Sequence, residues 1–220
     1  MKIKGHDNHH TAFTFLEILI VVVTVVFLAA LILPLFARAK TRSNFGCISR
    51  LKQVGLGFRM WSNDNGEKFP WQVSTNRGGT LEYAASSEVW RHYAIASNEF
   101  NSPKILRCPY DQSRIAASGW ASFKNINLSY FAGLEADETR PNTILSGDRN
   151  LTTNGVALKP GVALVATNHA LGYTTAIHNG SGNIGLGDGS AQMIAPAALN
   201  TQFQLAARTN ALPALRFALP

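Results

Sequence analysis

The stretch Thr11–Phe36 reads TAFTFLEILIVVVTVVFLAALILPLF, and the interpretation of the whole chain depends on it. Its nineteen residues from Ile18 to Phe36 carry no charge. As a helix they are long enough to cross a bilayer, which takes roughly 20 apolar residues. One carboxylate, Glu17, lies at the start of the apolar run. Because a carboxylate is costly in lipid, we expect Glu17 either to lie at the headgroup level, where a helix N-terminus favours an anion, or to pair with a cation of another chain.

The segment 12–17, AFTFLE, resembles the processing site of type IV prepilins and type II secretion pseudopilins. In that family a prepilin peptidase cuts after a small residue and methylates the new N-terminal aromatic residue, and a Glu four residues further on guides filament assembly. The resemblance implies a cut between Ala12 and Phe13, and a contact of Glu17 with the Phe13 ammonium of a neighbouring subunit. Ala12 stands where the family usually has Gly, so we expect slower or tolerated cleavage.

The helix is expected to continue beyond the apolar stretch. From Arg38 to Trp61 apolar residues recur at three- and four-residue intervals with basic residues opposite, which indicates an amphipathic helix. The run Asn63–Gly66 supplies a stop signal, with Gly66 suited to a left-handed cap. Pro34 should kink the helix, because its ring removes one backbone hydrogen bond.

The second half of the chain has a sequence pattern typical of an antiparallel sheet. Short apolar runs alternate with turn residues from Asn127 onward, and they predict strands at 128–134, 143–146, 156–158, 162–166, 173–178, 184–186 and 191–194. Within this part His178 is followed, after nine residues, by Asp188-Gly189. That spacing resembles the C-terminal signature of a large pseudopilin-like family whose members also carry a prepilin N-terminus.

Together these features predict an α+β, pilin-like fold, in which a long N-terminal helix lies on a small antiparallel sheet. We divide the chain into a leader (1–12), a membrane-spanning or filament-core helix (13–36), its amphipathic continuation (37–65), a globular domain (66–194) and a C-terminal extension (195–220), in which a helix is expected at 198–208.

The His178–Asp188 signature is open to three interpretations. A turn at 179–183 could bring the two side chains together as a structural pair that fixes the register of a hairpin. Asp188 with loop carbonyls could instead bind calcium, as loops do in some secretion pseudopilins. A catalytic pair is less well supported, since the sequence offers no evident nucleophile.

Cys47 and Cys108 are the two cysteines of the chain. In an oxidising compartment they could form a disulfide between the helix and the domain; the alternative is two buried free thiols. A zinc site that adds His169 or His178 needs unrelated spacing, so we expect neither zinc nor any other cofactor, calcium at Asp188 being the one exception considered.

The net charge of +7 is concentrated next to the apolar stretch. Residues 61–220 hold twelve basic and eleven acidic side chains, whereas 37–60 hold six basic ones. This basic stripe, made of Arg38, Lys40, Arg42, Arg50, Lys52 and Arg59, suits lipid headgroups or acidic neighbours better than a nucleic acid, and no nucleic-acid partner is expected.

The charge pattern and the resemblance disagree on orientation. Cations just after the span would place the domain in the cytoplasm, whereas the prepilin resemblance implies the bacterial inner membrane with a periplasmic domain, and we follow the resemblance. A third interpretation is a signal peptide cleaved near Ala37-Arg38-Ala39, for which the apolar run is too long.

The resemblance therefore predicts a filament subunit rather than an enzyme. Its expected partners are copies of itself, other pilin-like subunits, the prepilin peptidase and the inner-membrane assembly platform. The alternative is a single-pass membrane protein whose extracytoplasmic domain binds a ligand.

Overall fold

The computed structural model describes the backbone of residues 14–220 and the side chains of residues 14–32 and 46–220. The chain divides into two compact units at residue 43, and each is described by itself. The leader and the predicted cut between Ala12 and Phe13 lie outside the described residues.

One helix, α1 (Phe15–Asp64), begins in the first unit and ends in the second. It is helical at residue 34, but the Pro34 side chain belongs to the stretch that is not described, so the kink stays a prediction. The helix ends where the sequence predicted: Gly66 follows with φ +70°, a backbone conformation that glycine adopts without strain.

In the second unit α1 buries one stripe of side chains. The buried residues recur at intervals of three and four, and they are Cys47, Leu51, Val54, Phe58 and Trp61. Leu56 and Met60, which we had assigned to the same face, are about half exposed. The amphipathic pattern is therefore confirmed, with a narrower apolar face than predicted.

The chain from the end of α1 to the sheet forms short helices. Two are α-helical, α2 (Trp90–Ala94) and α3 (Ser97–Phe100), and six are 3₁₀ turns: η1 (Pro70–Gln72), η2 (Thr75–Arg77), η3 (Leu81–Tyr83), η4 (Pro103–Leu106), η5 (Trp120–Ser122) and η6 (Asn125–Asn127). The segment at η4 resembles an extended strand in sequence. It turns instead because the Ser102 hydroxyl accepts from the Lys104 N–H and Pro103 takes the first helical position.

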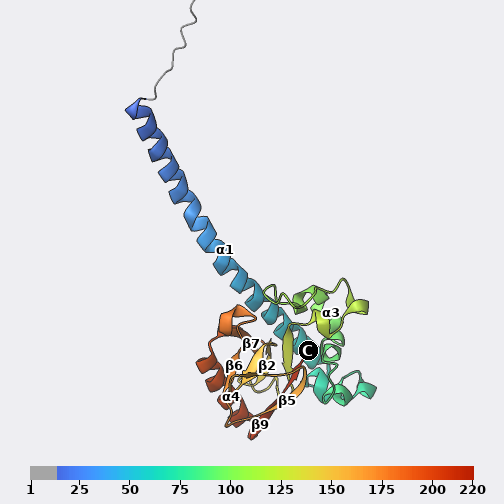
Figure 1. Ribbon diagram of the computed structural model, residues 1–220. Coiled ribbons are helices and arrows are strands. Elements are labelled where there is room, and N and C mark those ends of the chain that lie inside the picture. The colour runs from blue at the N-terminus through green and yellow to red at the C-terminus, as the bar shows by residue number, and fades with distance from the viewer. Residues whose placement is uncertain (1–13) are drawn as a thin grey trace, which may run out of the picture. The chain divides into compact units, whose positions relative to one another are not determined.

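The sheet part of the unit is antiparallel throughout (Figure 1). Its strands are β1 (Tyr130–Gly133), β2 (Ile144–Asp148), β3 (Leu151–Thr153), β4 (Val156–Ala157), β5 (Gly161–Ala166), β6 (Leu171–Tyr173), β7 (Gly182–Leu186), β8 (Ala191–Ile194) and β9 (Ala214–Leu219). They form a six-stranded sheet in the order β5-β9-β1-β2-β7-β8 and a three-stranded sheet in the order β4-β3-β6. The α+β class is thus confirmed.

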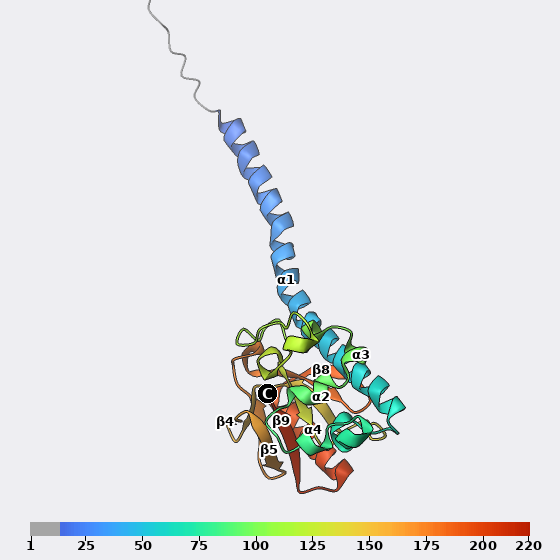
Figure 2. The ribbon, with the colours of Figure 1, turned by 90° about the vertical axis from the view of Figure 1, so that its right-hand side faces the viewer.

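The central strands β1 and β2 are buried along their whole length, and because successive side chains of a strand point to opposite sides, both faces of the sheet are covered there. On β1, Tyr130 and Ala132 pack in a core with the buried stripe of α1, while Phe131 packs in a second core. That second core contains Phe203 of helix α4 (Pro196–Asn210) and Phe217 of β9. Figure 2 shows the domain in a second view, in which the C-terminal end of α1 and the helix α4 can be followed next to the sheet.

The C-terminal segment belongs to the domain. We had assigned Ala195–Pro220 to an extension, but β9 lies between β5 and β1 inside the main sheet, and the predicted helix at 198–208 is the middle of α4. One predicted strand is misplaced: 173–178 shares only Tyr173 with β6, after which the chain leaves the sheet and forms the 3₁₀ turn η7 (His178–Gly180).

Candidate functional site

The N-terminal half of α1 presents an unusually apolar surface. Phe15–Ile32 is long and apolar enough to cross a membrane, with a mean hydropathy of 3.0, and none of its side chains is buried within the chain. Such a surface requires lipid or protein to cover it. The described residues therefore contain one candidate membrane segment. A membrane anchor and a signal sequence both have this length and composition.

Glu17 closes the start of this helix. Its Oε2 accepts from the backbone N–H of Thr14 at 2.9 Å and from the Thr14 hydroxyl at 3.1 Å. The Glu17 N–H in turn points at the Thr14 Oγ1 at 3.4 Å. This is a capping box, in which the first-turn carboxylate satisfies otherwise free N–H donors. The sequence carried this signal as T-x-x-E, and it explains how the helix tolerates a carboxylate beside its apolar surface.

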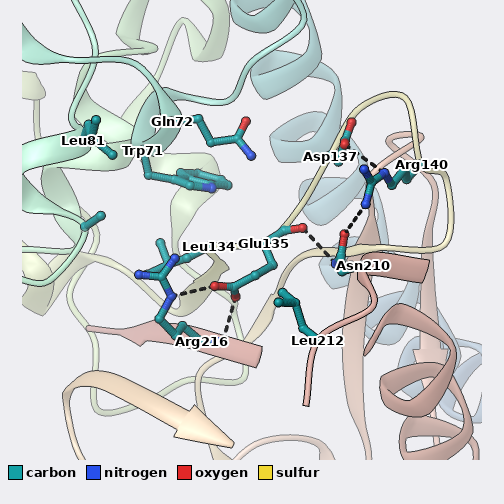
Figure 3. A pocket seen from close by; sticks show the side chains of 11 residues that line it. Trp71, Gln72, Leu81, Leu134, Glu135, Asp137, Arg140, Asn210, Leu212 and Arg216 are labelled. Carbon is teal, nitrogen blue, oxygen red and sulfur yellow. Dashed lines mark hydrogen bonds and ion pairs between the residues drawn. The ribbon is translucent and has the colours of Figure 1, made fainter. Parts of the chain in front are cut away.

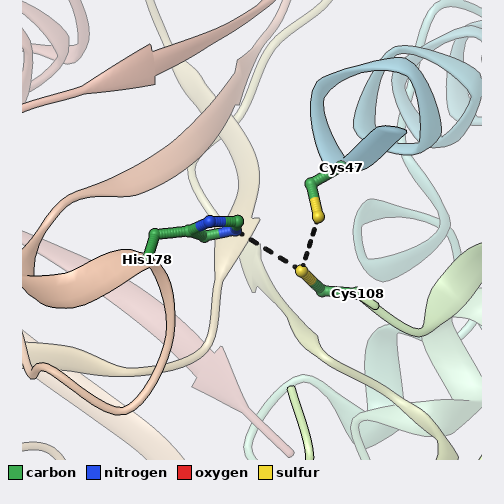
Figure 4. Close-up of side chains that lie close together, drawn as sticks. All are labelled: Cys47, Cys108 and His178. Atoms are coloured by element: carbon green, nitrogen blue, oxygen red, sulfur yellow. Dashed lines mark hydrogen bonds between the residues drawn. The ribbon is translucent and has the colours of Figure 1, made fainter. Parts of the chain in front are cut away.

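A second candidate site is a buried cluster in the domain, where two cysteines and a histidine converge from separate elements (Figure 4). Cys47 comes from α1, Cys108 from the turn after η4, and His178 from η7. The two Sγ atoms lie 2.8 Å apart as free thiols, and the His178 Nε2 lies 3.4 Å from the Cys108 Sγ. The cysteines are thus close together, which fits either a disulfide or two buried thiols. His178 is the third member of the cluster, and we had considered it for a zinc site but did not favour that interpretation.

An aspartate completes the cluster. Asp148, at the end of β2, is fully buried, and its Oδ2 lies 3.5 Å from the His178 Nε2. The same oxygen accepts from the backbone and side-chain N–H groups of Asn183 at 2.7 and 2.9 Å. Its Oδ1 has no hydrogen-bond partner among residues 14–220. Sequence reasoning missed Asp148, because nothing in the run Ile144–Asp148 distinguishes it from a strand-end residue.

The backbone aims His178 inward at a conformational cost. His178 and Asn179 both have positive φ, +55° and +53°, where side chains other than glycine are strained. Tyr110 packs its ring against the imidazole at 4.8 Å, and the His178 side chain is 1% exposed. The Asn183 amide directs an N–H at the Nε2 from 2.9 Å, so the Nε2 lone pair accepts from Asn183 when Nε2 carries no proton.

Burial and mutual contact shift the pKa values in the cluster. Burial raises the pKa of Asp148 to about 6, although His178 and the Asn183 hydrogen bonds oppose the shift. The pKa of Cys47 is lowered because Cys108 donates a hydrogen bond to it, and the same bond raises the pKa of Cys108. Burial lowers the pKa of His178, but Cys108 and Asp148 more than offset this and leave it raised. The pKa of each of these groups therefore depends on whether its neighbours in the cluster are protonated.

The predicted contact between His178 and Asp188 is wrong. The two residues lie at opposite ends of β7, whose five residues span about 16 Å. The carboxylate beside His178 is that of Asp148, and the Asp188 Oδ1 accepts from the Ser190 N–H instead. The hairpin turn that joins β7 to β8 contains Asp188-Gly189, not residues 179–183 as we had expected.

Each end of this signature contacts α1 at a different point. His178 reaches Cys108 next to Cys47, and the Asp188 carbonyl accepts from the Arg59 Nη1 at 2.8 Å. Between them, a β-carbon on Gly185 would lie 3.5 Å from the Leu51 side chain. The signature therefore lays β7 along the buried stripe of α1.

The basic stripe is partly used inside the domain. Arg50 donates to the Arg107 carbonyl at 2.5 Å, and Arg59 pairs with Glu138 at 3.3 Å. These two residues therefore have partners within the domain, Lys52 is exposed, and the side chains of Arg38, Lys40 and Arg42 lie outside the described part, so the role at lipid headgroups stays a prediction.

A surface depression of about 370 Å³ lies between Trp71, the chain after β1 and the strand β9 (Figure 3). Its charged side chains satisfy one another: Glu135 pairs with Arg216 at 2.6 Å and Asp137 with Arg140 at 3.2 Å. It therefore offers a ligand no unpaired charge among the residues drawn in Figure 3.

No protein-family model, curated protein or solved structure matches this chain.

Proposed function

We propose that the protein is a structural subunit of a pilin-like filament, inserted in the bacterial inner membrane by α1 and polymerised through the same helix. The observation that carries the proposal is the apolar surface of Phe15–Ile32, none of whose side chains is buried within the chain. In the membrane lipid covers this surface, and in a filament neighbouring copies of the helix cover it.

Glu17 gives the assembly its register. Its capping box uses one carboxylate oxygen, Oε2, so the carboxylate stays at the helix start with a fixed orientation. A prepilin-type cut after Ala12 would create an ammonium on Phe13, four residues from Glu17. Within one chain the capping box occupies the carboxylate, and in a filament the ammonium of the adjacent subunit neutralises it. An unpaired carboxylate among apolar helices would otherwise cost on the order of 2.5–3.5 kcal/mol.

The domain supports this role because α1 is built into its core. The buried stripe from Cys47 to Trp61 packs against the sheet, so force applied to the helix is transmitted to the folded domain. The domain would face the periplasm, and further partners are other pilin-like subunits, the prepilin peptidase and the assembly platform.

The test is a pair of variants in cells that carry the assembly machinery. Glu17→Ala should leave the protein in the membrane fraction but remove it from filaments sheared off the cells. Glu67→Ala, which removes an exposed carboxylate beyond the end of α1, is the matched control and should give wild-type filaments. Normal filaments from Glu17→Ala would refute the proposed pairing, and loss from the membrane would show that Glu17 serves insertion instead.

A further inference from the structure

We propose that Cys47, Cys108 and His178 bind a transition-metal ion of the zinc class. Asp148 is not one of the three donors that already lie within 4.8 Å of one another, and it would approach as the fourth ligand from its place 3.5 Å from the His178 Nε2. The proposal concerns the folded domain alone and does not depend on the filament role. The site would be structural, because both cysteines are fully buried and no substrate could approach them directly.

The donor atoms have the chemistry and spacing of such a site. Thiolate sulfur and imidazole nitrogen are the preferred ligands of zinc, and the three donor atoms all lie within 4.8 Å of one another. Bonds of about 2.0–2.3 Å in tetrahedral geometry place neighbouring ligand atoms about 3.3–3.8 Å apart. The His178 Nε2 lies 3.4 Å from the Cys108 Sγ and 3.5 Å from the Asp148 Oδ2, both within that range.

The sulfur atoms would have to separate. Their distance of 2.8 Å is about 1 Å shorter than two thiolates on one zinc ion require. Cys108 lies in a turn after η4, outside the regular elements, so it is the side that can move. Metal binding should therefore leave α1 in place and shift the Cys108 turn.

A disulfide would explain fewer features of the cluster. It would account for the two sulfur atoms, but not for a buried imidazole on a strained backbone with its Nε2 3.4 Å from the Cys108 Sγ. It would also leave the buried Oδ1 of Asp148 without a partner. A divalent cation would add to the compensation that this carboxylate receives at Oδ2 from Asn183 and His178, and it would have to replace the Asn183 N–H that points at Nε2.

The charges around the proposed ion are close to balance. Two thiolates and one carboxylate carry one negative charge more than a divalent ion neutralises. Arg50 lies about one turn along α1 from Cys47 and adds a positive charge close to this end of the cluster. The ion would join α1, the Cys108 turn and η7.

The first measurement uses the full chain, purified in detergent without chelator from cells grown with zinc, and determines bound metal together with the intact mass. We expect about one zinc per chain and two reduced thiols. Replacement by Co²⁺ should give a thiolate-to-cobalt charge-transfer band and the visible bands of a tetrahedral ion. Removal of the metal by a chelator should lower Tm, and adding zinc back should restore it.

Variants then assign the ligands. Cys108→Ser and His178→Gln should each abolish the cobalt charge-transfer band or weaken cobalt binding by more than about 100-fold, and Asp148→Asn should weaken binding by about 10- to 100-fold. His169→Gln is the matched control, since His169 lies in the turn between β5 and β6, and it should bind cobalt like the wild type.

Two results would overturn the proposal. One is metal-free protein whose mass is lower by two hydrogens, which would show a disulfide between Cys47 and Cys108. The other is reduced wild-type protein that binds Co²⁺ without a thiolate charge-transfer band. This second measurement uses the wild type alone, so it does not depend on whether a variant folds. Unchanged binding in Asp148→Asn would contradict the assignment of the fourth ligand.

Discussion

Gly55 of helix α1 lies directly against Gly189 of the β7–β8 turn: a β-carbon on Gly55 would come within 3.0 Å of the Gly189 Cα and carbonyl oxygen. Backbone meets backbone here, so a side chain on Gly55 would push the hairpin away from the helix. A β-carbon on Gly189 would meet the Arg59 side chain at 3.0 Å and the Gly55 backbone only at 3.8 Å, so what requires glycine at this position is its positive φ of +81°.

Gly55→Ala should lower the free energy of unfolding by about 1–3 kcal/mol, the usual cost of overpacking a well-packed core. Chemical denaturation of the full chain in detergent measures it. Gly46→Ala is the control, because nothing lies within 4 Å of its β-carbon position and alanine is the better helix former by about 1 kcal/mol. Equal stabilities of the two variants would contradict the close contact.

Burial of His92 should make the domain less stable in mild acid. His92 is fully buried and its Nδ1 pairs with the Thr80 hydroxyl at 2.8 Å, so burial lowers its pKa from 6.5 to about 4. The unfolded chain then binds a proton that the folded chain does not, and the free energy of unfolding falls by up to about 3 kcal/mol as the pH drops from 6.5 to 4.

In His92→Gln this contribution should disappear, so the wild type should lose stability faster than the variant across that pH window. Other groups titrate there too, and the difference between the two proteins isolates His92. Parallel pH profiles would show that His92 does not resist protonation in the folded state.

The ion pair between Asp111 and Arg149 should be a major contributor to stability. Arg149 binds the carboxylate with two hydrogen bonds, 2.7 and 3.0 Å long, and the Asp111 side chain is 2% exposed. Arg149→Met leaves a buried carboxylate without its cation and should cost about 3 kcal/mol. Arg91→Met, which removes a largely exposed pair with Glu88, should cost about 1 kcal/mol or less. Similar losses in both variants would mean that burial does not strengthen the first pair.

The C-terminal strand should be indispensable. Phe217 of β9 is 1% exposed and packs against Phe131 and Phe203, so Phe217→Ala should cost about 3–5 kcal/mol. Leu164→Ala on the neighbouring strand β5 removes a side chain that is 69% exposed and should change stability little. A mild effect of Phe217→Ala on thermal unfolding would argue that β9 is a detachable tail.

Local signals predicted much of the fold. The end of α1 and the helix α4 follow from side-chain periodicity and capping, which depend on residues close in the sequence. The strand β9 was missed because Pro213 and Pro220 suggested a frayed tail, although both lie just outside the strand.

The buried cluster could not be predicted from spacing. Cys47 and Cys108 are 61 residues apart, and Cys108 and His178 are 70 apart, so no short motif joins them. Asp148 carries no local signal at all, and only the pairing of β2 with β7 brings it next to Asn183. The expected contact between His178 and Asp188 failed because the five-residue strand β7 separates them.

The most direct test of the filament proposal is the mass of the mature N-terminus, measured on protein from membranes and on protein sheared from the cell surface. The proposal predicts a chain that begins at a methylated Phe13 in both fractions. A chain that keeps Met1 would leave a permanent membrane anchor, and one that begins at Lys40 would be a secreted domain. Either result would contradict assembly through Glu17 and the Phe13 ammonium.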